Sequence, residues 1–245
     1  MFAACSSQNT VVIHGSSDGG AMMGGDGGTS GGDEGGTGSD GGMPGVDSGP
    51  GYTGGPLSCT GIAAVVNNYS GCGIERWTVK VGEDSQAGAI ALTATATTIT
   101  ALAAMNGGLV YSNPPATSRV APTEKSVVFL KDVTVVYARL ESDSDYHLAI
   151  QDGTFRTMIA EVPYPGAAGV GCVSGSWECL ISHARAAVDK AIAPTTNGRN
   201  PGGIATIVGV PFYDFSHMQA YEAPNSIELH PVLAICFGKG CTPGL

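Results

Sequence analysis

The sequence predicts a mainly β protein, built on a five-stranded Greek-key barrel with one helix between the third and fourth strands. Three observations predict this class. Alternating apolar residues indicate three strands between 131 and 162, helical spacing of apolar residues follows from 179 to 193, and two further apolar runs come after the helix. This order, three strands, a helix and two strands, is that of an OB-fold.

The first three strands are indicated by period-two alternation and by the turns between them. Apolar side chains alternate in 133–137 and again in 146–150, on either side of a bend at Asp143–Asp145. The turn signal Gln151-Asp152-Gly153 ends the second strand, and the third runs through 158–162.

The helix is indicated by a change of period between Cys179 and Ala193. Apolar residues fall on one helical face, namely Ile181, Ala184, Val188 and Ile192. After a loop at 194–203, residues 204–210 and 227–235 read as the fourth and fifth strands.

The N-terminal part divides by composition. Residues 1–55 hold 19 of the 38 glycines, six acidic residues and no lysine or arginine, which predicts a disordered tether. Residues 56–130 are predicted to be a β-rich extension, and 131–245 the barrel. The extension's β-like runs are Ile62–Val66, Trp77–Val81, Ala89–Thr93 and Val127–Leu130.

The start of the chain predicts export and a lipid anchor. Ala3, Ala4 and Cys5 match the end of a lipoprotein signal peptide, where the cysteine is acylated. Phe2 stands where Leu is usual, and the alternative is an ordinary N-terminus with a chance cysteine. We expect a protein of the bacterial cell envelope, membrane-anchored through Cys5 and facing the periplasm or cell exterior. The sequence contains no run of about 20 apolar residues, so it predicts no transmembrane helix.

Six further cysteines support an oxidising compartment, because their number is even and they lack zinc-finger spacing. Six cysteines allow 15 disulfide connectivities. Local pairing is the simplest hypothesis, and it gives Cys59–Cys72, Cys172–Cys179 and Cys236–Cys241.

Strand parity predicts a polar cluster on the barrel. Side chains two apart share a face of a strand, so Asp145 pairs with His147, and Glu228 with His230. Glu161 is a lone acid on the third strand, which neighbours the second and the fifth in an OB barrel. We therefore expect these five residues to converge. The residues Asp214, His217 and Asn225 lie in the adjacent hairpin.

This cluster has a catalytic and a structural interpretation. His147, Glu161, Glu228 and His230 offer a general base and carboxylates that hold a divalent cation, although the metal stays open. The alternative is a set of solvated residues or cross-strand charge pairs, with Asp214 and Asn225 shaping the loop.

Arg76 and Trp77 form a second candidate. An indole beside a guanidinium can stack on a base or sugar and bind a phosphate. The alternative, which the sequence favours, is that Trp77 packs in the core with charged flanks.

Three blocks of sequence resemble an uncharacterised family of exported bacterial proteins. The blocks are Glu75–Gly82, Glu141–Leu148 with Thr157–Pro163, and Gly209–His217 with Pro224–Pro231. The resemblance spans most of 75–236 and implies an exported single domain without an established activity. The family usually shows Gly where this chain has Met218 or Ser226.

Charge limits the functional hypotheses. The whole chain has a net charge of −10. Residues 56–245 hold 11 basic and 15 acidic residues, a net charge of −4, so binding of nucleic acid would need a local basic groove. The first hypothesis is a binding module for an oligonucleotide, an oligosaccharide or an envelope protein, near His147 and Glu161. The second is a metal-assisted nuclease or phosphodiesterase, and the third a structural envelope lipoprotein.

Overall fold

The computed structural model describes residues 52–67, 71–73, 75–166 and 172–244. Cys5 and residues 1–51 of the predicted tether lie outside these ranges, so lipidation stays a prediction. The chain divides into two units, Met1–Met43 and Pro44–Leu245, and all described residues belong to the second.

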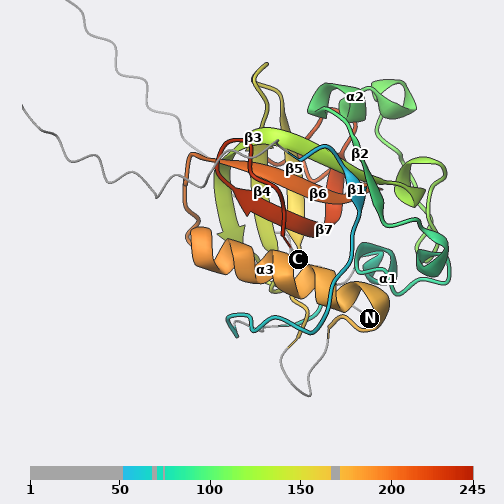
Figure 1. Cartoon of the computed structure of the whole chain (residues 1–245). Coiled ribbons are helices and arrows are strands. Elements are labelled where there is room, and N and C mark those ends of the chain that lie inside the picture. Colours follow the sequence, from blue (N-terminus) through green and yellow to red (C-terminus); the bar gives the residue numbers. More distant parts are fainter. Residues whose placement is uncertain (1–51, 68–70, 74, 167–171, 245) are drawn as a thin grey trace, which may run out of the picture. The chain divides into compact units, whose positions relative to one another are not determined.

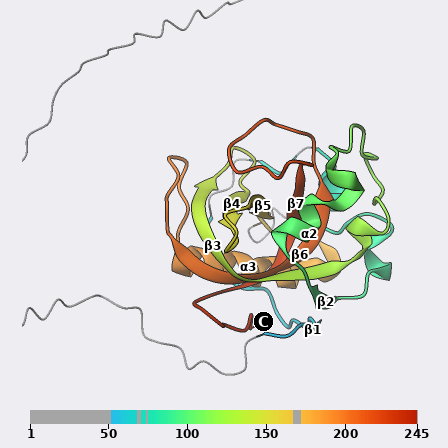
Figure 2. The same ribbon diagram turned by 90° about the horizontal axis from the view of Figure 1, so that it is seen from above.

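Five strands close into a barrel: β3 (Val127–Leu140), β4 (Tyr146–Gln151), β5 (Thr157–Val162), β6 (Gly203–Tyr213) and β7 (Ile227–Phe237). Two short strands, β1 (Gly55–Pro56) and β2 (Thr93–Ala96), extend the sheet from β3. The strand order in the sheet is β1-β2-β3-β4-β5-β7-β6, and β3 also pairs with β6, which completes the ring seen in Figure 2. Strands β5 and β7 are parallel and the other barrel pairs antiparallel. The predicted OB-fold-like barrel is confirmed.

The helix α3 (Glu178–Ala191) lies between β5 and β6 in the chain, as predicted, and runs across the barrel (Figure 1). Its residues Ala184 and Val188 pack into the barrel core, as does Ile192 just beyond its end. Two short helices, α1 (Trp77–Lys80) and α2 (Ile99–Ala103), precede the barrel. Among the described residues, no helix has the length and apolar character needed to cross a membrane.

Strands β4, β5, β6 and β7 bury nearly all residues of both faces, whereas β3 is only half-buried along one face of its second half. The inward face forms the main core, to which β4, β5 and β7 contribute alternate residues such as Leu148, Ala160 and Leu229. A second core covers part of the outside, where Val208 and Val210 of β6 pack with residues of the preceding segment. Because this segment covers the barrel, polar side chains on the outer face are buried too.

The segment before the barrel is mostly irregular rather than β-rich. Trp77–Val81, predicted as β-like, is the helix α1 and its C-terminal cap. Val79, Lys80 and Val81 are all buried in succession, and a strand with one buried face cannot bury consecutive side chains. Ile62–Val66 forms no strand, β2 begins only at Thr93, and Val127–Leu130 opens β3.

All six described cysteines form disulfides, which indicates an oxidising compartment. The predicted pair Cys236–Cys241 is confirmed. The predicted local pairs Cys59–Cys72 and Cys172–Cys179 are wrong, because the bonds are Cys59–Cys179 and Cys72–Cys172. These two bonds join the N-terminal segment to the region of α3 across 120 and 100 residues, so they restrict the unfolded chain far more than local pairs would.

Candidate functional site

Two adjacent pockets lie where β4 and β5 meet two loops. The first, here called the acidic pocket, has a volume of about 360 Å³. It is lined by Glu75, Lys80, Arg139, Glu141, Ser142, Asp143, Glu161, Asp214, His217 and Gln219. The second, the tyrosine pocket, has a volume of about 430 Å³ and shares Arg139 and Gln219 with the first. It is also lined by Tyr137, His147, Asn200, Ala220 and Tyr221.

Strand register brings the predicted polar residues together behind these pockets. His147 lies directly opposite Glu161 in the β4–β5 ladder, and its Nδ1 is 2.9 Å from Oε1 of Glu161. The other oxygen of Glu161, Oε2, is 3.1 Å from Nδ1 of His230 on β7. Glu161 therefore bridges two histidines on two neighbouring strands.

His230 has a carboxylate on each side of its ring. Nδ1 lies 3.1 Å from Oε1 of Glu228, and Nε2 lies 3.6 Å from Oδ2 of Asp145. Asp145, His147, Glu161, Glu228 and His230 thus form one group, the histidine–carboxylate cluster. The convergence follows the predicted parity, but every member is buried, so the solvated interpretation does not apply.

The cluster contains buried polar atoms without hydrogen bonds. Oδ1 of Asp145 accepts a hydrogen bond from the Tyr164 N–H, whereas Oδ2 has no hydrogen-bond partner among the described residues. The same is true of Nε2 of His230 and Oδ1 of Asp214. Since buried polar groups are nearly always paired, these atoms mark a place where a partner is expected.

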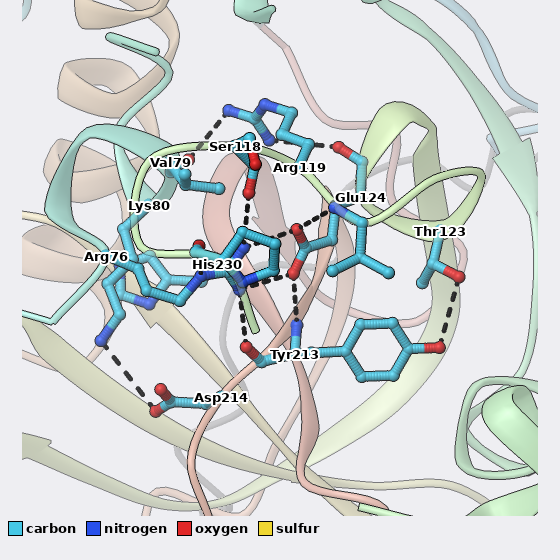
Figure 3. Close-up of polar contacts among 12 residues, drawn as sticks. Arg76, Val79, Lys80, Ser118, Arg119, Thr123, Glu124, Tyr213, Asp214 and His230 are labelled. Atoms are coloured by element: carbon cyan, nitrogen blue, oxygen red, sulfur yellow. Dashed lines mark hydrogen bonds and ion pairs between the residues drawn. The ribbon is translucent and has the colours of Figure 1, made fainter. Parts of the chain in front are cut away.

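Lys80 is a buried basic side chain beside this excess of acids. Its Nζ lies 4.0 Å from Oδ2 of Asp214, toward which it extends in Figure 3. Burial disfavours the charged ammonium, but Glu228, Asp214, Glu161 and Asp145 together raise the pKa of Lys80. Lys80 is therefore a fixed positive charge at the floor of the acidic pocket.

Burial and hydrogen bonding pull the pKa values of the acids apart. Burial raises the pKa of Asp145 to about 7 and that of Glu228 to about 8. Glu161 is equally buried, but hydrogen bonds from His147 and His230 hold its pKa well below the usual value. Carboxyl groups with such different proton affinities, side by side, are typical of functional sites.

The histidines are shifted in the opposite sense to simple burial. Burial alone would lower the pKa of each ring, but hydrogen bonds to Glu161 and Glu228 raise the pKa of His230 to about 9. The hydrogen bond and charge of Glu161 likewise raise the pKa of His147.

The three predicted hairpin residues separate into two roles. His217 is half-exposed at the edge of the acidic pocket, with Nε2 3.3 Å from Oδ2 of Asp214. Asn225 is fully buried, and its Nδ2 donates to the carbonyl oxygens of Leu102 and Met105. Asn225 thus holds the loop to α2, in line with the loop-shaping alternative.

Arg76 occupies a different buried network, shown in Figure 3. Two of its N–H groups bind Glu124, at 2.7 and 2.8 Å. The other three donate to the carbonyl oxygens of Pro115, Ser118 and Tyr213. All five donors of the guanidinium are occupied, so none remains for a phosphate.

Trp77 also has protein partners. Its Nε1 donates to the Cys172 carbonyl, and its ring packs against the second core. These contacts agree with the packing interpretation of Trp77.

The sequence predicted Asp214 and His217, which line the acidic pocket, but missed most of the other pocket-lining residues outside the cluster. Tyr137 and Arg139 lie two residues apart on β3, and Arg139 lies opposite His147 in the β3–β4 ladder, so both share the outer face of the cluster. The alternation of residues along β3 could have predicted this position. Tyr221 and Gln219 carry no such signal, since they lie in the irregular β6–β7 loop.

The chain matches no known protein family, no curated protein and no solved structure. The resemblance to exported bacterial proteins therefore remains a prediction from the three sequence blocks.

Proposed function

We propose that this protein is an extracytoplasmic binding module that recognises an oligosaccharide at the acidic and tyrosine pockets. One observation carries the proposal. In an OB-fold, ligands bind on strands two and three and on the loops that follow strands one and four. Here these elements are β4, β5, the β3–β4 loop and the β6–β7 loop. The β3–β4 loop and β5 contribute to the acidic pocket, β4 contributes His147 to the tyrosine pocket, and the β6–β7 loop lines both.

The charge of the site favours a sugar over a nucleic acid. Five carboxylates line the acidic pocket, against Lys80 and Arg139. Such a lining repels phosphates, which nucleic-acid proteins attract with an excess of positive charge. Carboxylate oxygens are instead good acceptors for hydroxyl hydrogens, and a neutral oligosaccharide presents many of these.

The tyrosine pocket supplies the apolar surface that a sugar ring needs. Tyr137 and Tyr221 stack with their centroids 6.3 Å apart, and Tyr221 is 41% exposed. Gly198 has a left-handed φ of +74°, and a Cβ there would lie 2.2 Å from the Tyr137 hydroxyl. Glycine at 198 therefore lets the loop pass against Tyr137 and fixes this ring at the wall of the pocket.

The cellular setting is part of the same proposal. Three disulfides support a place outside the cytoplasm. An acylated Cys5 and the glycine-rich tether would hold the module at a membrane of the cell envelope while leaving it free to reach a glycan.

Glycan binding is tested with the full chain, its disulfides formed, on an array of neutral and acidic oligosaccharides, with single-stranded DNA and RNA as competitors. We expect binding to neutral oligosaccharides, at least tenfold weaker in Tyr221→Ala. Phe155→Ala is the matched control, because Phe155 is an exposed aromatic residue (82%) outside both pockets. Binding to DNA or RNA alone would contradict the proposal, and binding to neither would favour a structural envelope protein.

A second candidate is metal-assisted phosphodiester hydrolysis. It is favoured by the pair His147 and Glu161, in which a carboxylate orients an imidazole at the wall of the tyrosine pocket. Incubation of the chain with DNA and RNA, in Mg²⁺, Zn²⁺ or EDTA, tests it. Metal-dependent cleavage that is lost in both His147→Ala and His230→Ala would establish a nuclease, and intact substrates would exclude one.

A further inference from the structure

Two buried atoms of opposite chemical character face each other in the histidine–carboxylate cluster. Oδ2 of Asp145 and Nε2 of His230 lie 3.6 Å apart, too far for a hydrogen bond. Asp145 is 1% exposed and His230 is 0% exposed, and neither atom has a hydrogen-bond partner among the described residues. At this distance the two can form an ion pair when the ring is protonated, but buried polar atoms are nearly always hydrogen-bonded as well, so a partner between them is expected.

The other side of the His230 ring fixes the direction of Nε2. Nδ1 has two carboxylates at 3.1 Å, Glu161 and Glu228. Metal-binding histidines are held in this way, with the second ring nitrogen donating its hydrogen to a carboxylate. One hydrogen on Nδ1 needs one acceptor, so Glu228 can hold the ring while Glu161, whose Oε2 lies 3.1 Å from the same nitrogen, gives up this contact to a ligand.

We propose that Asp145, Glu161 and His230 bind one divalent transition-metal ion. One oxygen of each carboxylate and one nitrogen of the imidazole lie within 4.8 Å of one another. Metal–ligand bonds of about 2.0–2.2 Å place adjacent ligand atoms roughly 3–3.6 Å apart, which the separation of Asp145 and His230 meets. The ion replaces the proton on Nε2 and pairs with two carboxylates.

The donor set selects the class of metal. An imidazole nitrogen with two carboxylate oxygens suits Zn²⁺ and similar ions, whereas Ca²⁺ and Mg²⁺ prefer ligand shells made of oxygen alone. The surroundings are acidic as well, because four carboxylates, those of Asp145, Glu161, Glu228 and Asp214, lie near enough to Lys80 to act on its charge. Glu161 also lines the acidic pocket, so the proposed ion lies one side chain behind it.

Other groups of metal-ligating residues are weaker. Cys59, Cys179 and His183 approach one another, but both cysteines are consumed by a disulfide. Two further groups reach solvent, which can satisfy them without an ion. Glu75 and His217 are exposed beside Asp214, and Glu141 is partly exposed beside His147 and Glu161.

Zn²⁺ titration of the full chain, stripped with EDTA and with its disulfides formed, tests the proposal directly. We expect one Zn²⁺ per chain, and at least about tenfold weaker binding in Asp145→Asn and in His230→Gln. Asparagine keeps the oxygen that accepts from Tyr164, so the fold at this strand is preserved. His183→Gln is the matched control, because His183 lies in α3, outside the cluster.

The position of the ion gives an answer that does not depend on the variants. Crystals of the unaltered chain grown with Zn²⁺ should show an anomalous peak between Asp145 and His230. No stoichiometric Zn²⁺ binding, a peak elsewhere, or unchanged affinity in both folded variants would overturn the proposal. None of these results bears on oligosaccharide binding, because the glycan array can be repeated in EDTA, where the ion is absent.

Discussion

Two buried ionic groups, the histidine–carboxylate cluster and an arginine network, share this domain and differ in one respect. The arginine network consists of Arg76, Glu124, Arg119 and Asp84, and its two positive and two negative charges balance. Both oxygens of Glu124 accept backbone N–H groups as well, from Tyr213 and Val120. In the cluster, acids outnumber bases and three side-chain atoms in and beside it have no hydrogen-bond partner among the described residues.

The comparison shows that burial of charge does not by itself identify a functional site. The arginine network is as buried as the cluster, but every strong donor of Arg76 is used within the protein, so the network holds the fold. The cluster keeps capacity for a further partner, and it lies beside two pockets. The two ionic groups therefore differ in the polar atoms that lack a hydrogen-bond partner, and not in how deeply they are buried.

The segment before the barrel contributes Arg76 to the arginine network and places Lys80 beside the histidine–carboxylate cluster. The disulfide Cys72–Cys172 fixes this segment. Replacing Cys72 and Cys172 with alanine should cost about 4–5 kcal/mol of unfolding free energy, because this bond closes a loop of about 100 residues. Urea unfolding measures the loss. The matched control, replacement of Cys236 and Cys241, should cost about 2 kcal/mol, since these cysteines are five residues apart. Equal losses would show that the segment is held by its ionic contacts instead.

Removing one charge from the balanced network should be nearly as damaging. Glu124→Gln leaves the Arg76 guanidinium buried without its counter-charge, which should cost about 3–5 kcal/mol in urea unfolding. Glu178→Gln is the control, because this acid lies in the first turn of α3 and should contribute at most about 1 kcal/mol. A loss below about 1 kcal/mol in Glu124→Gln would remove the structural role given to the network.

The opposite behaviour is expected in the cluster. Glu228→Gln should change the unfolding free energy by no more than about 1 kcal/mol when measured at neutral pH in EDTA. Burial raises the pKa of Glu228 to about 8, so this acid is mostly uncharged at neutral pH, and the glutamine amide resembles that form while its oxygen still accepts from His230. Destabilisation comparable to that of Glu124→Gln would make the two ionic groups equivalent and break the comparison.

Local sequence pattern predicts much of the barrel and of the histidine–carboxylate cluster, but it does not predict the arginine network. Period-two alternation predicts the first three barrel strands and apolar runs predict the last two. Parity brings His147, Glu161 and His230 together, because partners on neighbouring strands share a face. The contact of Arg76 with Glu124 spans 48 residues of irregular chain, where no periodicity operates. The same holds for Cys59–Cys179 and Cys72–Cys172. Burial of the cluster was missed because it depends on this irregular segment.

The most direct test of the difference between the two groups is thermal and urea unfolding with and without Zn²⁺, in the unaltered chain, Glu124→Gln and Asp145→Asn. At about 100 times its Kd, Zn²⁺ should stabilise the unaltered chain by about 2.7 kcal/mol. Glu124→Gln should be much less stable yet gain as much from Zn²⁺. Asp145→Asn should keep its stability in EDTA and gain almost nothing. An equal gain in Asp145→Asn, or none in the unaltered chain, would contradict the assignment of the histidine–carboxylate cluster as a ligand site.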